Sequence, residues 1–244
     1  MSVVKTLQTE TLHLPVQNLL LAALSRETFL SLLPNLEPVD LLFKQVLYES
    51  RQPMKHVYFP NHGVVSLLTI LAKADNSTAE VGLVGREGMV GLPVFLGIDT
   101  TPIKAIVQVS GDAMRMQADA FGDAVKGDSS LHELLQRYTY GLMFQISQSA
   151  ACNNYHSVAE RCCRWLLMTQ ERAGSDQFPL THEFLSQMLG VRRASITVVA
   201  GDLQKAGLIR YSRGQIDILD HPGLEAAACE CYGIVKAEFD YWLG

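Results

Sequence analysis

Residues 180–219, LTHEFLSQMLGVRRASITVVAGDLQKAGLIRYSRGQIDIL, constrain the fold more than any other part of the chain. Two short amphipathic helical patterns are separated by Gly190, and a run of alternating apolar residues follows Gly207. Two helices joined by a turn of three or four residues form a helix-turn-helix, whose second helix fits the DNA major groove. The alternating run predicts a β-hairpin wing that turns at Ser212-Arg213-Gly214.

The two helices have predictable ends and faces. We expect Thr181 to cap the first helix, with Glu183 in its first turn, and Gly190 to end it in the left-handed conformation. The apolar spacing places these residues on the inner face: Phe184, Leu185, Met188, Leu189, Ile196, Val199, Ala200 and Leu203. The second helix leaves these residues outside: Arg193, Ala194, Thr197, Val198, Gly201 and Gln204.

The charge of this segment is opposite to that of the whole chain. The formal net charge of the protein is −5, whereas residues 180–214 carry five Lys or Arg and two Asp or Glu, a net charge of +3. Salt screens charges over roughly 10 Å, so a local basic patch can act on DNA phosphates despite the acidic remainder. A plain helical hairpin could share the apolar spacing, but the wing and the charge reversal favour DNA binding.

We expect different tasks for the polar residues of this segment. Arg193, one turn before Thr197 on the open face, is the expected contact to a base edge. Arg192, Arg210 and Arg213 are expected to contact phosphates. The complete set of expected DNA-binding residues is Thr181, Arg192, Arg193, Ser195, Thr197, Gln204, Arg210 and Arg213.

The preceding residues alternate between helical and strand-like patterns. Residues 14–48 show leucines at helical spacing and predict short helices, with breaks at Pro34 and Pro38. Residues 57–71, 78–85 and 103–117 are β-branched or alternating runs, which predict a small β-barrel or roll.

A long, weakly charged helix is predicted from Ser129. These residues trace its apolar face: Leu131, Leu134, Leu135, Tyr138, Leu142, Ile146 and Ser149. Two alternatives stay open, a core helix against the barrel and a helix that also pairs with its twin in a dimer. Residues 157–174 predict a further helix that ends at Gly174, and residues 175–178 a linker.

Composition indicates a globular protein without a membrane anchor. Hydrophobic residues make up 48% of the 244 residues and charged residues 18%, enough apolar material for a core. Residues 1–15 lack a secretory pattern, and the apolar stretch 14–25 is too short to span a membrane. We therefore expect a cytoplasmic protein whose five cysteines are reduced thiols.

No residue pattern singles out a metal or cofactor. Cys162 and Cys163 diverge by about 100° on one helix, which disfavours joint ligation. Cys229 and Cys231 could bind a metal or sense oxidants, but we favour small buried residues on a helix over 224–235. No histidine stands out as a haem ligand among His13, His56, His62, His132 and His156. The expectation is no cofactor and no metal.

An enzyme is disfavoured by the motifs that are missing. The chain has no nucleophile elbow, His-Glu-x-x-His helix, phosphate-binding Gly-Lys loop or paired Cys-x-x-Cys. GLVGREGMVG, residues 82–91, is glycine-rich but follows a barrel-type strand, so we interpret it as turns. The remaining alternative to a DNA-binding regulator is a protein-interaction module that keeps the winged fold but no longer binds DNA.

With these motifs in place, the chain resembles bacterial transcription regulators of the Crp/Fnr type over about residues 14–220. Residues 180–219 carry the most specific likeness; VYFPNHGVVSLL and AERCCRWLLMT are similar in style. The resemblance implies an α+β fold: residues 1–128 with a β-roll like a cyclic-nucleotide-binding domain, a dimerisation helix over 129–156, and a winged helix-turn-helix domain over 157–244. It also implies a homodimer on a palindromic operator in double-stranded DNA, with RNA polymerase as a further partner.

The sequence departs from the cyclic-AMP-binding members of this family. Leu92 follows Gly91 where those members have Glu, and Pro102-Ile103 stands where they have Arg and Ser or Thr. Burying a phosphate there without a cation would cost several kcal/mol. We interpret Arg86, Glu87 and Lys104 as exposed turn charges, so no cyclic nucleotide is expected and the ligand, if one exists, is unknown. The family's N-terminal iron–sulfur cysteines are also missing, since no cysteine precedes Cys152.

Overall fold

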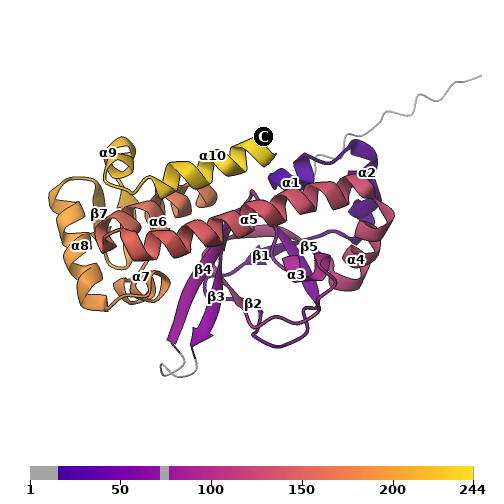
Figure 1. Ribbon diagram of the computed structural model, residues 1–244, viewed down its shortest axis with the longest axis horizontal. Coiled ribbons are helices and arrows are strands. Elements are labelled where there is room, and N and C mark those ends of the chain that lie inside the picture. The colour runs from indigo at the N-terminus through magenta and orange to yellow at the C-terminus, as the bar shows by residue number, and fades with distance from the viewer. Residues whose placement is uncertain (1–15, 72–76, 244) are drawn as a thin grey trace, which may run out of the picture.

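The computed structural model describes residues 16–71 and 77–243. Residues 1–15, in which we found no secretory pattern, and His13 lie outside the described residues. The fold is α+β, as predicted, with a β-roll and a winged helix-turn-helix joined by a long helix (Figure 1). No helix in the described ranges is both long and apolar enough to cross a membrane.

The β-roll is built on two long, bent strands. Its elements are β1 (Glu37–Leu41), β2 (Val46–Tyr48), β3 (His56–Leu71), β4 (Ser77–Val84) and β5 (Lys104–Gln117). The antiparallel order is β1-β5-β3-β4, and β2 also pairs with β5. The register of β3 on β5 shifts around Gly63, which has a φ of 87°. A Cβ there would lie 2.6 Å from the carbonyl oxygen of Val109, so the bend requires glycine.

The helical prediction for residues 14–48 is only partly correct. The structure has α1 (Leu19–Ala22), α2 (Arg26–Leu32) and a 3₁₀ turn, η1 (Leu33–Asn35), but residues 37–41 and 46–48 form β1 and β2. Leucine spacing alone does not distinguish a short helix from a short strand that buries single residues such as Leu41. Pro38 also fits the first strand, which borders only β5, because an edge strand tolerates a missing N–H.

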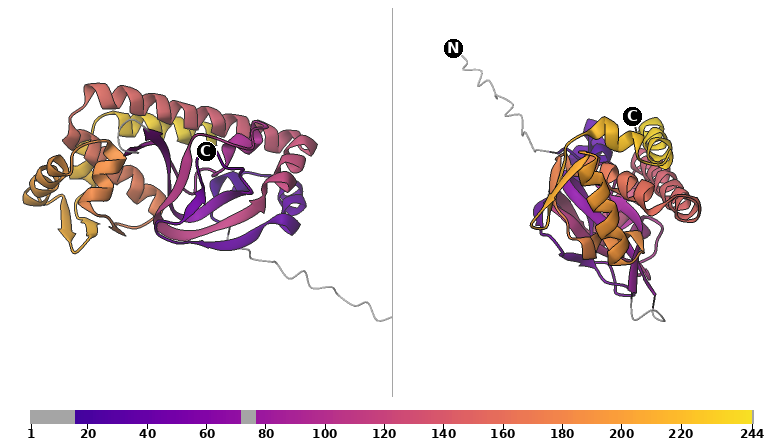
Figure 2. Two further views of the ribbon diagram at one scale, coloured as in Figure 1. Left: turned by 90° about the horizontal axis from the view of Figure 1, so that it is seen from below. Right: turned by 90° about the vertical axis from the view of Figure 1, so that its left-hand side faces the viewer.

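The long helix α5 (Ser129–Tyr155) follows α3 (Leu92–Phe95) and α4 (Ala118–Gly127). Asp128 caps α5, since its carboxylate accepts hydrogen bonds from the Ser130 and Leu131 amides at 2.8 and 3.0 Å. Leu131, Leu135, Tyr138 and Leu142 are buried, so the predicted apolar face packs into the core. The left panel of Figure 2 shows α5 extending from the β-roll to the C-terminal helices and wing.

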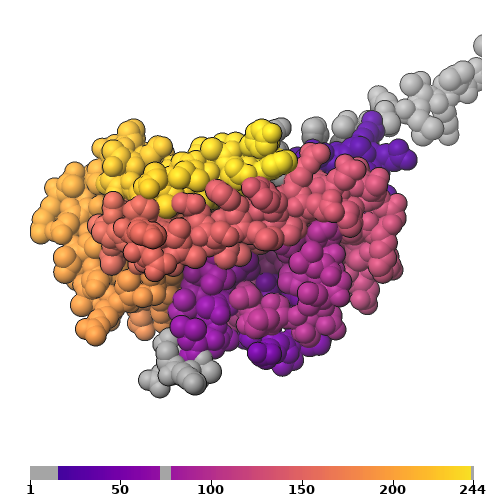
Figure 3. Space-filling model, viewed as in Figure 1, coloured from indigo at the N-terminus to yellow at the C-terminus, as the bar shows by residue number. Residues whose placement is uncertain are grey.

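The C-terminal third holds the remaining elements. They are α6 (Val158–Ala173), β6 (Gln177–Pro179), α7 (His182–Leu189), α8 (Arg193–Lys205), β7 (Ile209–Ser212), β8 (Gln215–Ile218), α9 (His221–Ala226) and α10 (Cys231–Leu243). A capping box between Ser157 and Glu160 starts α6, and Gly174, in the left-handed conformation, ends it as predicted. Helix α10 runs back along α5 on the surface (Figure 3).

Two sequence predictions in this part are wrong. Residues 175–178 were predicted as a linker, but residues 177–179 form β6, which pairs with β8 and adds a third strand to the wing. The helix expected over 224–235 is interrupted at residues 227–230, where the chain turns between α9 and α10. A three-residue strand containing a proline has too little pattern to detect, and the interruption lets α10 lie against α5.

The β-roll packs against two helices of the C-terminal part, α6 and α7. Buried apolar residues of both parts form one continuous cluster. A buried ion pair also crosses it, because Nε of Arg172 donates to Oε1 of Glu87 at 2.8 Å. Glu87 is therefore not the exposed turn charge that we expected. Gly85 lies directly against the Arg172 side chain, so residues 82–91 serve as a tightly packed contact.

Candidate DNA interface

The helix-turn-helix is held by local capping and a shared apolar face. The Thr181 hydroxyl accepts a hydrogen bond from the Phe184 amide at 3.1 Å, and Gly190 ends α7 with φ 64° and ψ 37°. Both predictions are confirmed. The predicted inner-face residues are buried, except that Val199 is half-buried. Packing of α7 on α8 thus fixes the direction in which the outer face of α8 points.

The outer face of α8 combines arginine with small and apolar side chains. Arg192 is the residue before α8 and Arg193 its first residue, and both are exposed. Ala194 and Thr197 are exposed beside them, and Val198 is 63% exposed. An apolar side chain so exposed on a helix stabilises no core, so it is available for contact with a partner.

A histidine that we did not anticipate braces this helix. Nδ1 of His182 lies 3.1 Å from Oγ1 of Thr197, and Thr197 Oγ1 donates to the Arg193 carbonyl at 3.2 Å. The His182 ring also stacks on Tyr211 of the wing, with centroids 4.4 Å apart. Burial, together with the charge of Arg193, lowers the pKa of His182 and favours the neutral ring. The Thr197 hydroxyl is thus already engaged within the domain.

The wing is a tight hairpin that presents an arginine at its tip. Arg213 and Gly214 link β7 to β8 with φ values of 51° and 77°, as a type I′ turn requires. Gln204 accepts a hydrogen bond from the Tyr211 amide at 2.9 Å and so ties α8 to the wing. Nε of Arg210 donates to Asp217 on the neighbouring strand at 2.8 Å.

The predicted site residues therefore fall into two groups. Within the described part of the chain, Arg192, Arg193 and Arg213 are exposed and form no ion pair. Four others have side chains already engaged within the domain: Thr181 and Thr197 on the helices, and Gln204 and Arg210 at the wing. Ser195 is half-buried, and its amide donates to the Arg192 carbonyl at 2.9 Å.

Two charged residues near the expected nucleotide phosphate site form ion pairs with other residues. Glu87 pairs with Arg172 as described, and Nζ of Lys104 lies 3.0 Å from Oε1 of Glu49. Leu92 is buried and Pro102 is exposed. Of the three turn charges considered above, only Arg86 is exposed without a carboxylate partner in the described residues.

A second group of chemistry-bearing residues was missed by sequence reasoning. Cys152, His156, Cys229 and Cys231 come together where α5 ends, each with one possible ligand atom within 4.8 Å of the others. The hydrogen bond with Cys229 and the charge of Arg164 lower the pKa of Cys152, against the effect of burial. The sequence carries no signal for this group. Cys152 and Cys229 are 77 residues apart in the chain, and the spacing of Cys152 and His156 at the end of a helix is not distinctive. These four residues are the ones in the described chain that could hold a metal ion.

The helix pair, the basic outer face and the wing define the class of winged helix-turn-helix DNA-binding proteins. Residues 160–227 match the family model of the Crp-like helix-turn-helix domain. This part of the chain accordingly belongs to the Crp-like helix-turn-helix domain family.

Solved structures agree with this assignment at the level of the fold. FixK2 from Bradyrhizobium japonicum superposes with a TM-score of 0.66 at 15% identity, covering 80% of this chain and 98% of that chain. A putative transcriptional regulator of the Crp/Fnr family from Eubacterium rectale gives 0.66 at 17% identity, covering 85% and 96%. A CRP-family transcriptional regulator from Thermus thermophilus gives 0.65 at 18% identity, covering 78% and 96%. No curated protein matches the chain in sequence.

Proposed function

We propose that this protein is a homodimeric regulator that binds a two-fold symmetric DNA site in a sequence-specific manner. The observation that carries the proposal is the outer face of α8, where Arg192 and Arg193 are exposed and unpaired among the described residues. In a dimer the two copies of α8 would enter successive major grooves about 34 Å apart.

The contacts of each half-site follow from the exposed side chains. Arg193 donates to a base edge, because it opens the helix that enters the groove. Arg192 and Arg213 contact phosphates, the second from the tip of the wing. Ala194, Val198 and the Thr197 methyl offer only apolar contact, which suits a thymine methyl group. Thr181, Ser195, Gln204 and Arg210 act by holding α8 and the wing in place.

The dimer forms through α5. Its surface carries exposed apolar side chains that include Tyr140 (47% exposed) and Met143 (62%). Ile146 lies one turn from Met143 and is 37% exposed. Residues spaced by three or four positions on a helix share a face, so these side chains supply an apolar seam for a second copy.

The β-roll does not bind cyclic AMP in this proposal. A buried phosphate needs a cation or several donors. Lys104 is paired with Glu49, and Leu92 and Pro102 replace the polar residues of nucleotide-binding relatives. The protein is therefore competent for DNA without that ligand.

The test is selection of genomic fragments by purified protein without added ligand, at two salt concentrations, followed by sequencing. The proposal expects a palindromic motif that persists at the higher salt. Arg193→Ala should relax the preference at one position of each half-site, at a cost of about 1–3 kcal/mol. Arg213→Ala should weaken operator and random DNA equally, and Arg26→Ala, an exposed arginine on α2, is the matched control.

Two outcomes would contradict the proposal. Equal losses on operator and random DNA for Arg193→Ala would remove its assignment to a base. Absence of retained DNA at either salt would instead favour a protein-interaction module with this fold, whose affinity for its partner would show little of the salt dependence that phosphate contacts cause.

A further inference from the structure

Four potential metal ligands converge at the junction of the long helix and the DNA-binding domain. Cys152 lies in the last turn of α5 and His156 directly follows this helix, while Cys229 and Cys231 flank the turn into α10. The three thiols are buried and the imidazole is half-buried. Sγ of Cys152 is 3.4 Å from Sγ of Cys229, and Sγ of Cys231 is 3.6 Å from Nδ1 of His156.

These spacings match one tetrahedral ion. A tetrahedral ion with Zn–S bonds of about 2.3 Å holds its sulfur ligands about 3.8 Å apart. All four ligand atoms here lie within 4.8 Å of one another. An iron–sulfur cluster places several irons and sulfides between its thiolates and so requires wider spacing. Three thiolates with one imidazole are also a ligand set typical of structural zinc.

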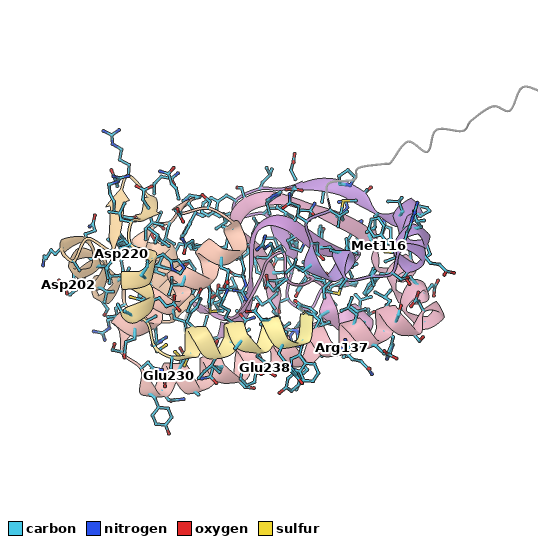
Figure 4. All side chains as sticks on the ribbon, turned by 90° about the horizontal axis from the view of Figure 1, so that it is seen from above. Met116, Arg137, Asp202, Asp220, Glu230 and Glu238 are labelled. Atoms are coloured by element: carbon cyan, nitrogen blue, oxygen red, sulfur yellow. The ribbon has the colours of Figure 1, made fainter. Side chains whose placement is uncertain are left out.

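Neighbouring side chains already orient the ligands as in a metal site. Nε2 of His156 lies 3.2 Å from a carboxylate oxygen of Glu230. With its proton on Nε2, the ring donates to Glu230 and directs the lone pair of Nδ1 towards the thiols, as metal-bound histidines do. The Gln148 amide donates to Sγ of Cys231 at 3.1 Å. Figure 4 places Glu230 where α10 begins beside the end of α5.

We propose that Cys152, His156, Cys229 and Cys231 bind one Zn²⁺ ion in a closed tetrahedral site. Binding displaces the thiol protons and leaves no position for water, so the site is structural and not catalytic. The ion ties the end of α5 to the segment between α9 and α10, across the joint at which α6 begins. It thereby fixes α10 along α5. The proposal is independent of DNA binding.

The test uses the full chain. Zinc per chain is measured by mass spectrometry on protein purified without added metal. The metal is then removed under reducing conditions and replaced with Co²⁺, whose absorption reports tetrahedral coordination and thiolate ligands. We expect one zinc per chain, intense visible Co²⁺ bands and thiolate charge transfer in the near ultraviolet.

Variants identify the ligands. Cys231→Ser and His156→Gln should abolish or shift the Co²⁺ spectrum, and Glu230→Gln should weaken the affinity about 10- to 100-fold while keeping the spectrum. Cys162→Ala is the matched control, because Cys162 is a buried cysteine on α6 outside the four-residue group. Its spectrum and affinity should equal those of the wild type.

Three results would overturn the proposal. The first is wild-type protein that binds no zinc and gives only the weak bands of octahedral Co²⁺. The second is iron with inorganic sulfide, which would establish a cluster. The third is a Cys152–Cys229 disulfide in freshly isolated protein, which would make the pair redox-active. All three results are measured on the wild-type protein, so they do not depend on whether a variant folds.

Discussion

Breaking the ion pair between Glu87 and Arg172 should destabilise the contact between the β-roll and the DNA-binding domain. Glu87 lies in the turn after β4 and Arg172 in the last turn of α6, and their side chains are 12% and 7% exposed. Oε1 of Glu87 also accepts the Gly85 amide, and Arg172 also donates to the Met168 carbonyl. Neither group can regain full hydration when its partner is removed.

The expected loss in the free energy of unfolding follows from the burial of these two side chains. Arg172→Met leaves the carboxylate buried with one backbone donor, which should cost about 3–5 kcal/mol in the free energy of unfolding. Glu87→Gln keeps the shape but removes the charge, and should cost about 3 kcal/mol. The double variant leaves no unpaired charge, so its loss should be smaller than the sum by about 2 kcal/mol.

The assay is urea denaturation of the four proteins, followed by tryptophan fluorescence, because Trp165 is buried on the same helix. Glu171→Gln is the control: it removes the neighbouring, more exposed pair with Lys236 and should cost less than about 1 kcal/mol. Additive losses in the double variant would refute the reasoning, since they would mean that the two charges do not act on each other.

Three further predictions concern other parts of the chain. Burial raises the pKa of Glu80 to about 7, so the folded state binds the Glu80 proton more tightly than the unfolded state. The free energy of unfolding should therefore fall as the pH rises from about 4.5 to above 7. Glu80→Gln should remove this dependence in urea titrations. Met143→Glu should weaken the proposed dimer at least about tenfold in analytical ultracentrifugation, because it places a charge in the apolar seam. Leu96→Glu, on an exposed apolar residue of the β-roll, should leave that dimer intact. If zinc is held at about 1,000 times its dissociation constant, it adds about 4 kcal/mol, and a chelator should lower the Tm of the wild type but not of Cys231→Ser.

Local patterns predicted the parts of the molecule that local chemistry determines. Thr181, Gly174 and Gly190 end or begin helices through their own backbone and side-chain preferences, and the structure has them in those roles. Strands β1 and β2 were missed because they are stabilised by pairing with β5, which lies far along the chain. The same limit explains the unexpected roles of His182 and Glu87, whose partners Tyr211 and Arg172 are distant in sequence.

The cluster of Cys152, His156, Cys229 and Cys231 shows this limit of sequence-based prediction most clearly. Sequence spacing placed Cys229 and Cys231 on one helix, where their side chains would diverge. The actual interruption at residues 227–230 turns both towards Cys152 and His156. Only the return of α10 along α5 brings the two segments together, and no periodicity in the chain encodes that return.

Because α5 is continuous, a rotation at one of its ends displaces the other end. Its 27 residues form an uninterrupted helix about 40 Å long, with one end on the β-roll and the other at the DNA-binding domain. A rotation of about 10° at the first end displaces the second by about 7 Å, which is close to the rise of two base pairs. In the proposed dimer, small changes of packing against Leu131 or Leu135 would therefore be amplified into the spacing of the two recognition helices, and that spacing would decide which half-sites the two copies can reach together.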